Sequence, residues 1–195
     1  FPCPRPVLAA NGSDLVQVKD QMASAVTWID AEPIGPMAPG AMVSRRMIWG
    51  VGVLLGTLHH LTDTTARPTR WTRPRWDLEG FLGLAPHWGK FWENRALSRD
   101  QAQLLMQQRD RARAWLSSLS RPDIGPIHAD PLGENILGDP RNLSLIDFDD
   151  CGTGYRLYDL GVALVQHWEH PRLPALIEAL AEGYASTRGC DAAPL

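Results

Sequence analysis

The sequence predicts an α+β protein in which helices dominate and short β-hairpins are embedded. Two short runs with β-branched residues, 15–19 and 25–29, are joined by a polar turn within an extended first segment, 1–30. Two further short strands, 135–137 and 143–148, flank a turn rich in Gly, Asp, Pro and Asn. Five apolar residues recur at helical spacing: Met47, Val51, Leu54, Leu58 and Leu61.

The other helices are predicted from capping and periodicity. Ser98 to Gln101 forms a capping-box sequence, and the helix that it opens ends before Pro122. We expect a nearly all-apolar, buried helix over 158–168 and a last helix over 174–184. The apolar face of the capped helix comprises Leu105, Ala112, Leu116 and Leu119.

Two segments read as connections between these elements. Residues 31–40 are rich in Pro and Gly, which predicts a linker. Residues 67–92 predict a loop-rich insertion with short helical turns, and they carry Trp71, Trp76, Trp88 and Trp92.

Composition excludes several classes of protein. The 195 residues are 44% hydrophobic with a net charge of −3, so no polyanion-binding face for nucleic acid is indicated. No run of about 18 apolar residues predicts a membrane span. The three cysteines show neither metal-ligand spacing nor a disulfide framework, which favours a reduced, cytoplasmic setting. The sequence does not indicate an oligomeric state.

The segment 127–152 carries the strongest chemical signal. If its two strands pair antiparallel, Asn135 and Asp147 lie nearly opposite, with Cα atoms about 4.5–5.5 Å apart. Asp130 precedes Asn135 by five residues, and Asp149 shares the face of Asp147 while the strand persists. Two carboxylates about 4 Å apart repel by roughly 4 kcal/mol at an effective dielectric of 20. Oxygen ligands of this kind therefore predict Mg²⁺ or Mn²⁺.

Simpler interpretations stand beside this one. Asp, Asn and Gly near turns are usually turn residues, and Asp149 and Asp150 taken singly can be read in this way. The combined pattern, His-x-Asp-x4-Asn followed twelve residues later by Asp-Phe-Asp, is much more specific.

These motifs resemble those of the aminoglycoside phosphotransferase and choline kinase family. IHADPLGENIL is similar to its catalytic loop, and LIDFDDCGTGYRLYDL to its metal loop and the following helix. The resemblance implies a protein-kinase-like fold: mainly the helical C-lobe (31–195) with its catalytic hairpin, after a remnant (1–30) of an N-lobe hairpin and hinge. It also implies ATP and Mg²⁺ as cofactors and a small-molecule hydroxyl group as acceptor.

The resemblance implies roles for individual residues. Asp130 is the expected catalytic base, worth about 10²–10⁴-fold in rate. Asn135 and Asp147 are the expected Mg²⁺ ligands, and Asp147 also organises the phosphates. Asp149 is a candidate second-metal or substrate ligand.

Three further roles are implied, each with a plainer alternative. Trp28-Ile29-Asp30 is the expected adenine-binding hinge, or else a strand end. His128 is a structural histidine on either interpretation. Asp159 braces the catalytic loop, or is an acid favoured by a helix N-terminus.

The sequence departs from the family upstream of the hinge. No glycine-rich loop is visible, and Lys19 lies only about ten residues before the expected hinge, so we expect it to be a solvated hairpin residue. Lys90 follows the hinge and cannot grip the phosphates. We therefore expect a truncated chain or a fragment that has lost most of its N-lobe.

The acceptor stays open between an aminoglycoside, an amino alcohol, homoserine and a sugar. The four tryptophans of the insertion either pack on the acceptor or, as we favour, cover the core. Asp149, Asp150 and Glu93 would favour a cationic acceptor.

Three functions compete at this point. They are a small-molecule kinase, a weak or inactive remnant that binds Mg-nucleotide or a partner, and a metal-dependent phosphohydrolase. The Asn and the His-x-Asp loop fit the last less well.

Overall fold

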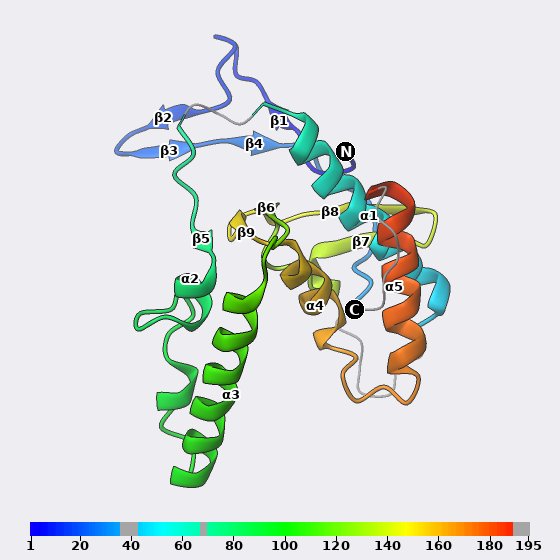
Figure 1. Ribbon diagram of the computed structural model, residues 1–195. Coiled ribbons are helices and arrows are strands. Elements are labelled where there is room, and N and C mark those ends of the chain that lie inside the picture. The colour runs from blue at the N-terminus through cyan, green and yellow to red at the C-terminus, as the bar shows by residue number, and fades with distance from the viewer. Residues whose placement is uncertain (36–42, 67–69, 189–195) are drawn as a thin grey trace.

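A computed structural model describes residues 1–35, 43–66 and 70–188 (Figure 1). The predicted linker 31–40 lies partly outside these ranges, and Cys190 wholly so. No helix within them is long and apolar enough to cross a membrane.

The strands are β1 Pro6–Val7, β2 Val16–Val18, β3 Gln21–Ala23, β4 Ala25–Val26, β5 Arg75–Trp76, β6 Ile124–Ile127, β7 Ile136–Asp139, β8 Asn142–Leu145 and β9 Gly152–Tyr155. The helices are α1 Arg45–Thr64, α2 Leu78–Leu82, η1 Phe91–Glu93, α3 Arg99–Ser118, η2 Gly133–Asn135, α4 Arg156–Val165 and α5 Leu173–Arg188.

The first segment is extended as predicted, but its strands pair differently. β2 pairs with β3 across a two-residue turn, whereas β4 pairs with β1. The run 25–29 therefore continues as a strand only to Val26. The segment after it joins the hairpin β7–β8, because Ile34 N donates to Ile136 O and Gly138 N to Glu32 O, both at 2.9 Å.

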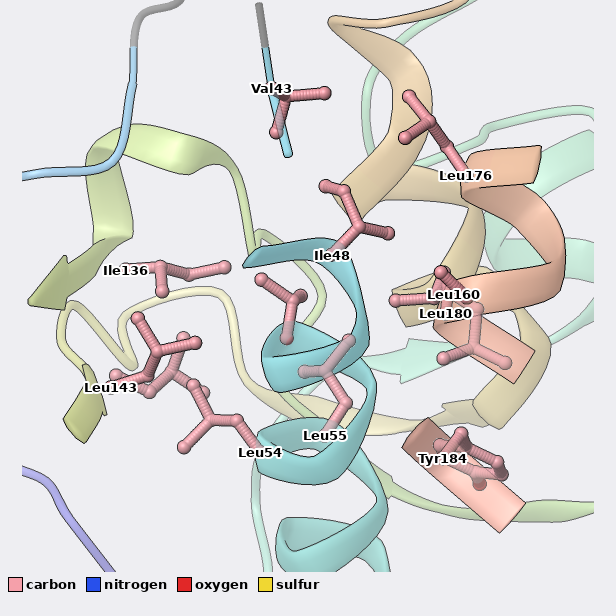
Figure 2. Close-up of a cluster of buried hydrophobic side chains, with 13 residues drawn as sticks. Val43, Ile48, Leu54, Leu55, Ile136, Leu143, Leu160, Leu176, Leu180 and Tyr184 are labelled. Carbon is pink, nitrogen blue, oxygen red and sulfur yellow. The ribbon is translucent and has the colours of Figure 1, made fainter. Parts of the chain in front are cut away.

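Helices α1 and α5 form the core of the molecule together with the hairpin β7–β8 (Figure 2). Leu55 and Leu180 are fully buried between the two helices. The glycines that weaken α1 as an isolated helix let the partner come close, because a Cβ at Gly52 would lie 2.2 Å from Leu180 O. Gly183 on α5 likewise lets α1 come close, because a Cβ at this position would lie 2.0 Å from Trp49 O.

The long helix α3 begins with the predicted capping box. Its apolar face is only half-buried, and none of its residues is fully buried. It packs on α2 and η1 through Arg109, whose guanidinium lies 4.6 Å from the Trp92 ring centroid and donates to Leu82 O at 2.8 Å. In Figure 1, α2 and α3 accordingly stand apart from the α1–α5 pair.

Helix α4 differs from the prediction of a buried, all-apolar helix over 158–168. It spans Arg156–Val165, and Leu157, Gly161 and Val165 on one side are exposed. Apolar composition alone did not reveal that only the opposite side packs inward. The last helix, α5, extends four residues beyond the predicted end, to Arg188.

A three-stranded sheet, β5-β9-β6, was not predicted from the sequence. β9 is glycine-rich because Trp76 packs directly against it: a Cβ at Gly154 would lie 2.6 Å from Trp76 Cβ. Because β6 runs into the loop that contains Asp130 and β9 follows the loop that contains Asp147, the sheet supports both loops from outside the hairpin.

Four charged side chains join the ends of α1, α4 and α5. Arg156 is 2% exposed and donates to Asp63 and to Asp123, and Arg188 contacts the same two carboxylates. Against the effect of its burial, the two guanidiniums hold the pKa of Asp63 at about 2. The network therefore anchors the residues that lead into β6.

Candidate active site

The three predicted centre residues lie at the end of the β7–β8 hairpin that is opposite its turn. Asn135 is the last residue of η2, directly before β7. The predicted strand 143–148 ends at Leu145, and Ile146 N donates to Asn135 O at 2.9 Å. Because Ile136 pairs with Leu145, Asn135 lies opposite Ile146 and not opposite Asp147 as predicted; Asp147 lies beyond the paired strands, just before a turn. Asp149 lies in this turn and not on a continuing strand face, so the reason given for its alignment with Asp147 was wrong.

Asp130 and Asn135 are in direct contact. Asn135 Nδ2 donates to the main-chain oxygen of Asp130 and to its carboxylate Oδ2, each at 2.9 Å. The amide nitrogen is thereby committed to Asp130, and the amide oxygen is left for another electropositive group.

The backbone is strained on both sides of this site. Ala129, directly before Asp130, has φ 73°, and Asp147 has φ 61°. Non-glycine residues in this left-handed region cost roughly 1–2 kcal/mol and cluster at functional sites. The methyl group of Ala129 is buried with Trp76 and Ile127, which offsets part of the strain.

His128 connects the two loops. Its Nδ1 accepts from Asp130 N at 3.2 Å, and its Nε2 donates to Ile146 O at 2.9 Å. The side chain is fully buried and packs edge-on against Phe148. It touches the residues on either side of the site and not the open space beside Asp130, as a structural histidine should.

Asp159, on α4, holds the loop that contains Asp130. Its two oxygens accept from His128 N and Ala129 N, both at 2.9 Å. It is 0% exposed, and Oδ2 also contacts His59 Nε2 at 3.1 Å. His59, whose Nδ1 contacts Tyr184 OH at 2.9 Å, was missed by sequence reasoning because a lone histidine on a helix carries no motif.

The acidic surroundings act on Asp130. Burial, followed by the charge of Asp150 and, less strongly, of Asp147, raises the pKa of the Asp130 carboxyl, whereas His128 and the bond from Asn135 oppose the shift. A raised pKa brings a carboxyl closer to the range in which a general base works near neutral pH.

The oxygen atoms at this site would suit a divalent cation that needs few protein ligands. Within residues 1–35, 43–66 and 70–188, no three His, Cys, Asp or Glu side chains converge on one point. The available oxygens are the Asn135 amide and the exposed Asp147 carboxylate. Two protein oxygens suit Mg²⁺, which usually keeps several waters and completes its shell with phosphate.

The tryptophan-rich insertion both covers the core and borders the site. Trp76 and Trp92 are buried, as the core-covering interpretation expects. Trp88 is 62% exposed and stacks on Trp76 with ring centroids 5.5 Å apart. A cavity of about 430 Å³ opens beside Asp130 and is lined by Trp88, Ala129, Asp130, Tyr158, Gly161, Val162 and Val165. Glu93 does not line it and pairs with Lys90 at 3.1 Å.

The expected hinge lies just before the contact with β7. Trp28 is 89% exposed, and Asp30 is also exposed. Ile29 is half-buried, and the next residues pair with the hairpin that ends at the site. Adenine binding by this segment stays a prediction.

Lys19 is placed as expected for a hairpin residue. It is exposed, has φ 57° and sits in the turn between β2 and β3.

Comparison with known proteins decides the lineage. Residues 1–193 match the model of the phosphotransferase enzyme family. The chain belongs to this family. The structure of a microcompartment-associated aminopropanol kinase superposes with a TM-score of 0.79 at 28% identity, covering 97% of this chain and 60% of that one. An amicoumacin kinase in complex with AMP-PNP and Ca²⁺ shares the fold, with a TM-score of 0.70 at 18% identity over 98% of this chain and 58% of that one.

A homoserine kinase of Hyphomonas neptunium (strain ATCC 15444) is 29% identical over 174 residues. The match covers 84% of this chain but 47% of that protein, so the chain spans about half the length of its curated relative. The predicted family and kinase-like α+β fold are thus confirmed.

Proposed function

We propose that the chain carries the phosphoryl-transfer centre of an ATP-dependent kinase that phosphorylates a hydroxyl group of a small molecule. The observation that carries this proposal is the arrangement of Asp130, Asn135 and Asp147 at one hairpin end, beside a cavity large enough for a small acceptor. Family membership supports the same reaction class.

Each residue has a definite task in this mechanism. Asp130 borders the cavity and takes the proton from the attacking hydroxyl group, and its raised pKa suits that task. The bond from Asn135 fixes the carboxylate orientation. Asn135 and Asp147 would hold Mg²⁺, which would neutralise charge on the transferred phosphate. His128 and Asp159 hold both loops in register.

The names of two relatives support a small acceptor. These relatives, which are 29% and 28% identical to this chain, are named for homoserine and for aminopropanol, both small alcohols that carry an amine. We therefore favour an acceptor of this size over an aminoglycoside or a sugar.

A second candidate function is a weak or inactive remnant that binds Mg-nucleotide. The two lysines of the sequence have other surroundings: Lys19 sits in the β2–β3 turn, and Lys90 pairs with Glu93. Loss of the phosphate-gripping lysine removes charge stabilisation of the transition state.

Replacement of Asp130 tests the proposal. We expect Asp130→Asn to lower transfer from Mg-ATP to an amino alcohol by about 10²–10⁴-fold, because the amide cannot accept the proton. Nucleotide affinity should stay within about twofold, since Asp130 does not contact the nucleotide. Turnover is measured by release of ADP, and affinity by calorimetry.

Asp20→Asn, in the exposed β2–β3 turn, is the control and should behave as the unmodified chain. Undiminished turnover in Asp130→Asn would remove Asp130 as the base. Nucleotide binding without any turnover in the unmodified chain would favour the remnant.

A further inference from the structure

The cavity beside Asp130 has an uneven distribution of polar groups. Among the described residues that line it, Asp130 alone is charged at neutral pH, and Tyr158 adds one hydroxyl group. The remaining wall is apolar and includes Val162 and Val165 from α4 and Trp88. No described lysine, arginine or histidine lines it, so an anionic group entering here would meet no cation.

A second carboxylate strengthens the negative character of the cavity. Trp76 Nε1 donates to Asp150 O at 2.7 Å, and the Trp76 ring stacks with those of Trp88 and Tyr158. This bond holds the main chain of Asp150 against the aromatic wall. Burial is the largest cause of the raised pKa of Asp130 and of Tyr158, and the negative charge of Asp150 adds to both shifts.

The size of the cavity depends on one glycine. Gly161 lies in α4 between Tyr158 and Val165, and a Cβ built on it would meet nothing within 4 Å. The backbone does not require glycine at this position, because Gly161 has no positive φ. A side chain at position 161 would instead extend into open space at the cavity wall.

We propose that this cavity selects an alcohol that carries a protonated amine and an apolar body but no carboxylate, and that Gly161 sets the largest body it admits. The proposal rests on the function proposed above and specifies its acceptor. The ammonium group pairs with the field of Asp130 and Asp150, and the apolar body packs against Trp88 and the valines of α4. A carboxylate in the same place would be desolvated beside two like charges.

Three matched probes separate these requirements. 2-Amino-1-phenylethanol has all the required features, 3-phenylserine adds only a carboxylate, and 1-phenyl-1,2-ethanediol replaces the amine by a hydroxyl group. In calorimetric titrations at pH 7 with saturating Mg·AMP-PNP, the first should bind at least about tenfold more tightly than either of the others. Equal or tighter binding of 3-phenylserine, or no binding of the amino alcohol by the nucleotide-bound chain, would overturn the proposal.

Variants at two positions test the structural assignment. Gly161→Ala and Gly161→Leu should weaken binding of the amino alcohol progressively, with complete loss for leucine, while thermal stability is kept or raised because both residues favour helix more than glycine does. Asp150→Asn should weaken amino alcohol binding about threefold to tenfold and leave binding of the diol unchanged. Asp20→Asn, on an exposed distant turn, is the charge control and should change neither.

The result separates this proposal from the proposed function. Absence of any Mg·AMP-PNP binding by the unmodified chain would contradict the function itself. Nucleotide binding combined with unchanged amino alcohol affinity in Gly161→Leu would contradict the acceptor site alone.

Discussion

Asp159→Ala is expected to lower the free energy of unfolding by about 3–5 kcal/mol, the cost of breaking a buried charged network. The variant leaves two buried N–H groups, those of His128 and Ala129, and the ring of fully buried His59 without their carboxylate. An unpaired buried donor costs about 1–3 kcal/mol. Because the catalytic loop loses its support, phosphoryl transfer should also fall at temperatures where the variant is still folded. Urea unfolding followed by tryptophan fluorescence measures the stability.

The size of this effect distinguishes the two interpretations of Asp159. An acid that only complements a helix N-terminus contributes about 0.3–1 kcal/mol. Asp20→Ala, on the exposed β2–β3 turn, should change stability by less than about 0.5 kcal/mol. A loss below 1 kcal/mol in Asp159→Ala, comparable to the control, would contradict the bracing role.

Gly183→Ala is expected to destabilise the protein by about 3 kcal/mol, at the upper end for an overpacked core. Its Cβ would lie 2.0 Å from Trp49 O and 3.1 Å from Val53 N, and these are backbone atoms of α1 that cannot rotate away. The two central helices would have to separate, which would open the cluster around Leu55 and Leu180 (Figure 2).

The same substitution in α4 provides the control for Gly183→Ala. At Gly161 the added Cβ meets nothing within 4 Å, and alanine favours a helix over glycine, so Gly161→Ala should be neutral or stabilising by up to about 1 kcal/mol. Thermal unfolding of the two variants should therefore shift in opposite directions. A similar shift in both would mean that the close contact of α1 with α5 does not determine stability.

Much of the fold was predictable because periodicity and capping act locally. The spacing of Met47 to Leu61 gave α1, and Ser98 gave the start of α3. The sheet β5-β9-β6 was missed because its strands are short, far apart in sequence and rich in glycine. The burial of α4 was overestimated since apolar composition does not show which face packs inward.

The candidate site was likewise predictable only where its residues are close together in the sequence. Asp130, Asn135 and Asp147 were predicted because they occur in one continuous motif, and the structure brings Asp130 and Asn135 into contact. His59 was not predictable, since it reaches Asp159 across 100 residues. Which acidic residues affect Asp130 also depends on tertiary placement. The charge of Asp150 helps to raise the pKa of Asp130, whereas Glu93 pairs with Lys90.

Calorimetric titration of the chain and of Asp147→Ala with AMP-PNP, in Mg²⁺ and after its removal with EDTA, tests the central claim most directly. The claim is that Asn135 and Asp147 hold the metal of a nucleotide. The chain should bind AMP-PNP only with Mg²⁺, and Asp147→Ala should lose this binding while keeping most of its thermal stability, because Asp147 is exposed. Unchanged titration heats in Asp147→Ala, or equal binding with and without Mg²⁺, would contradict it.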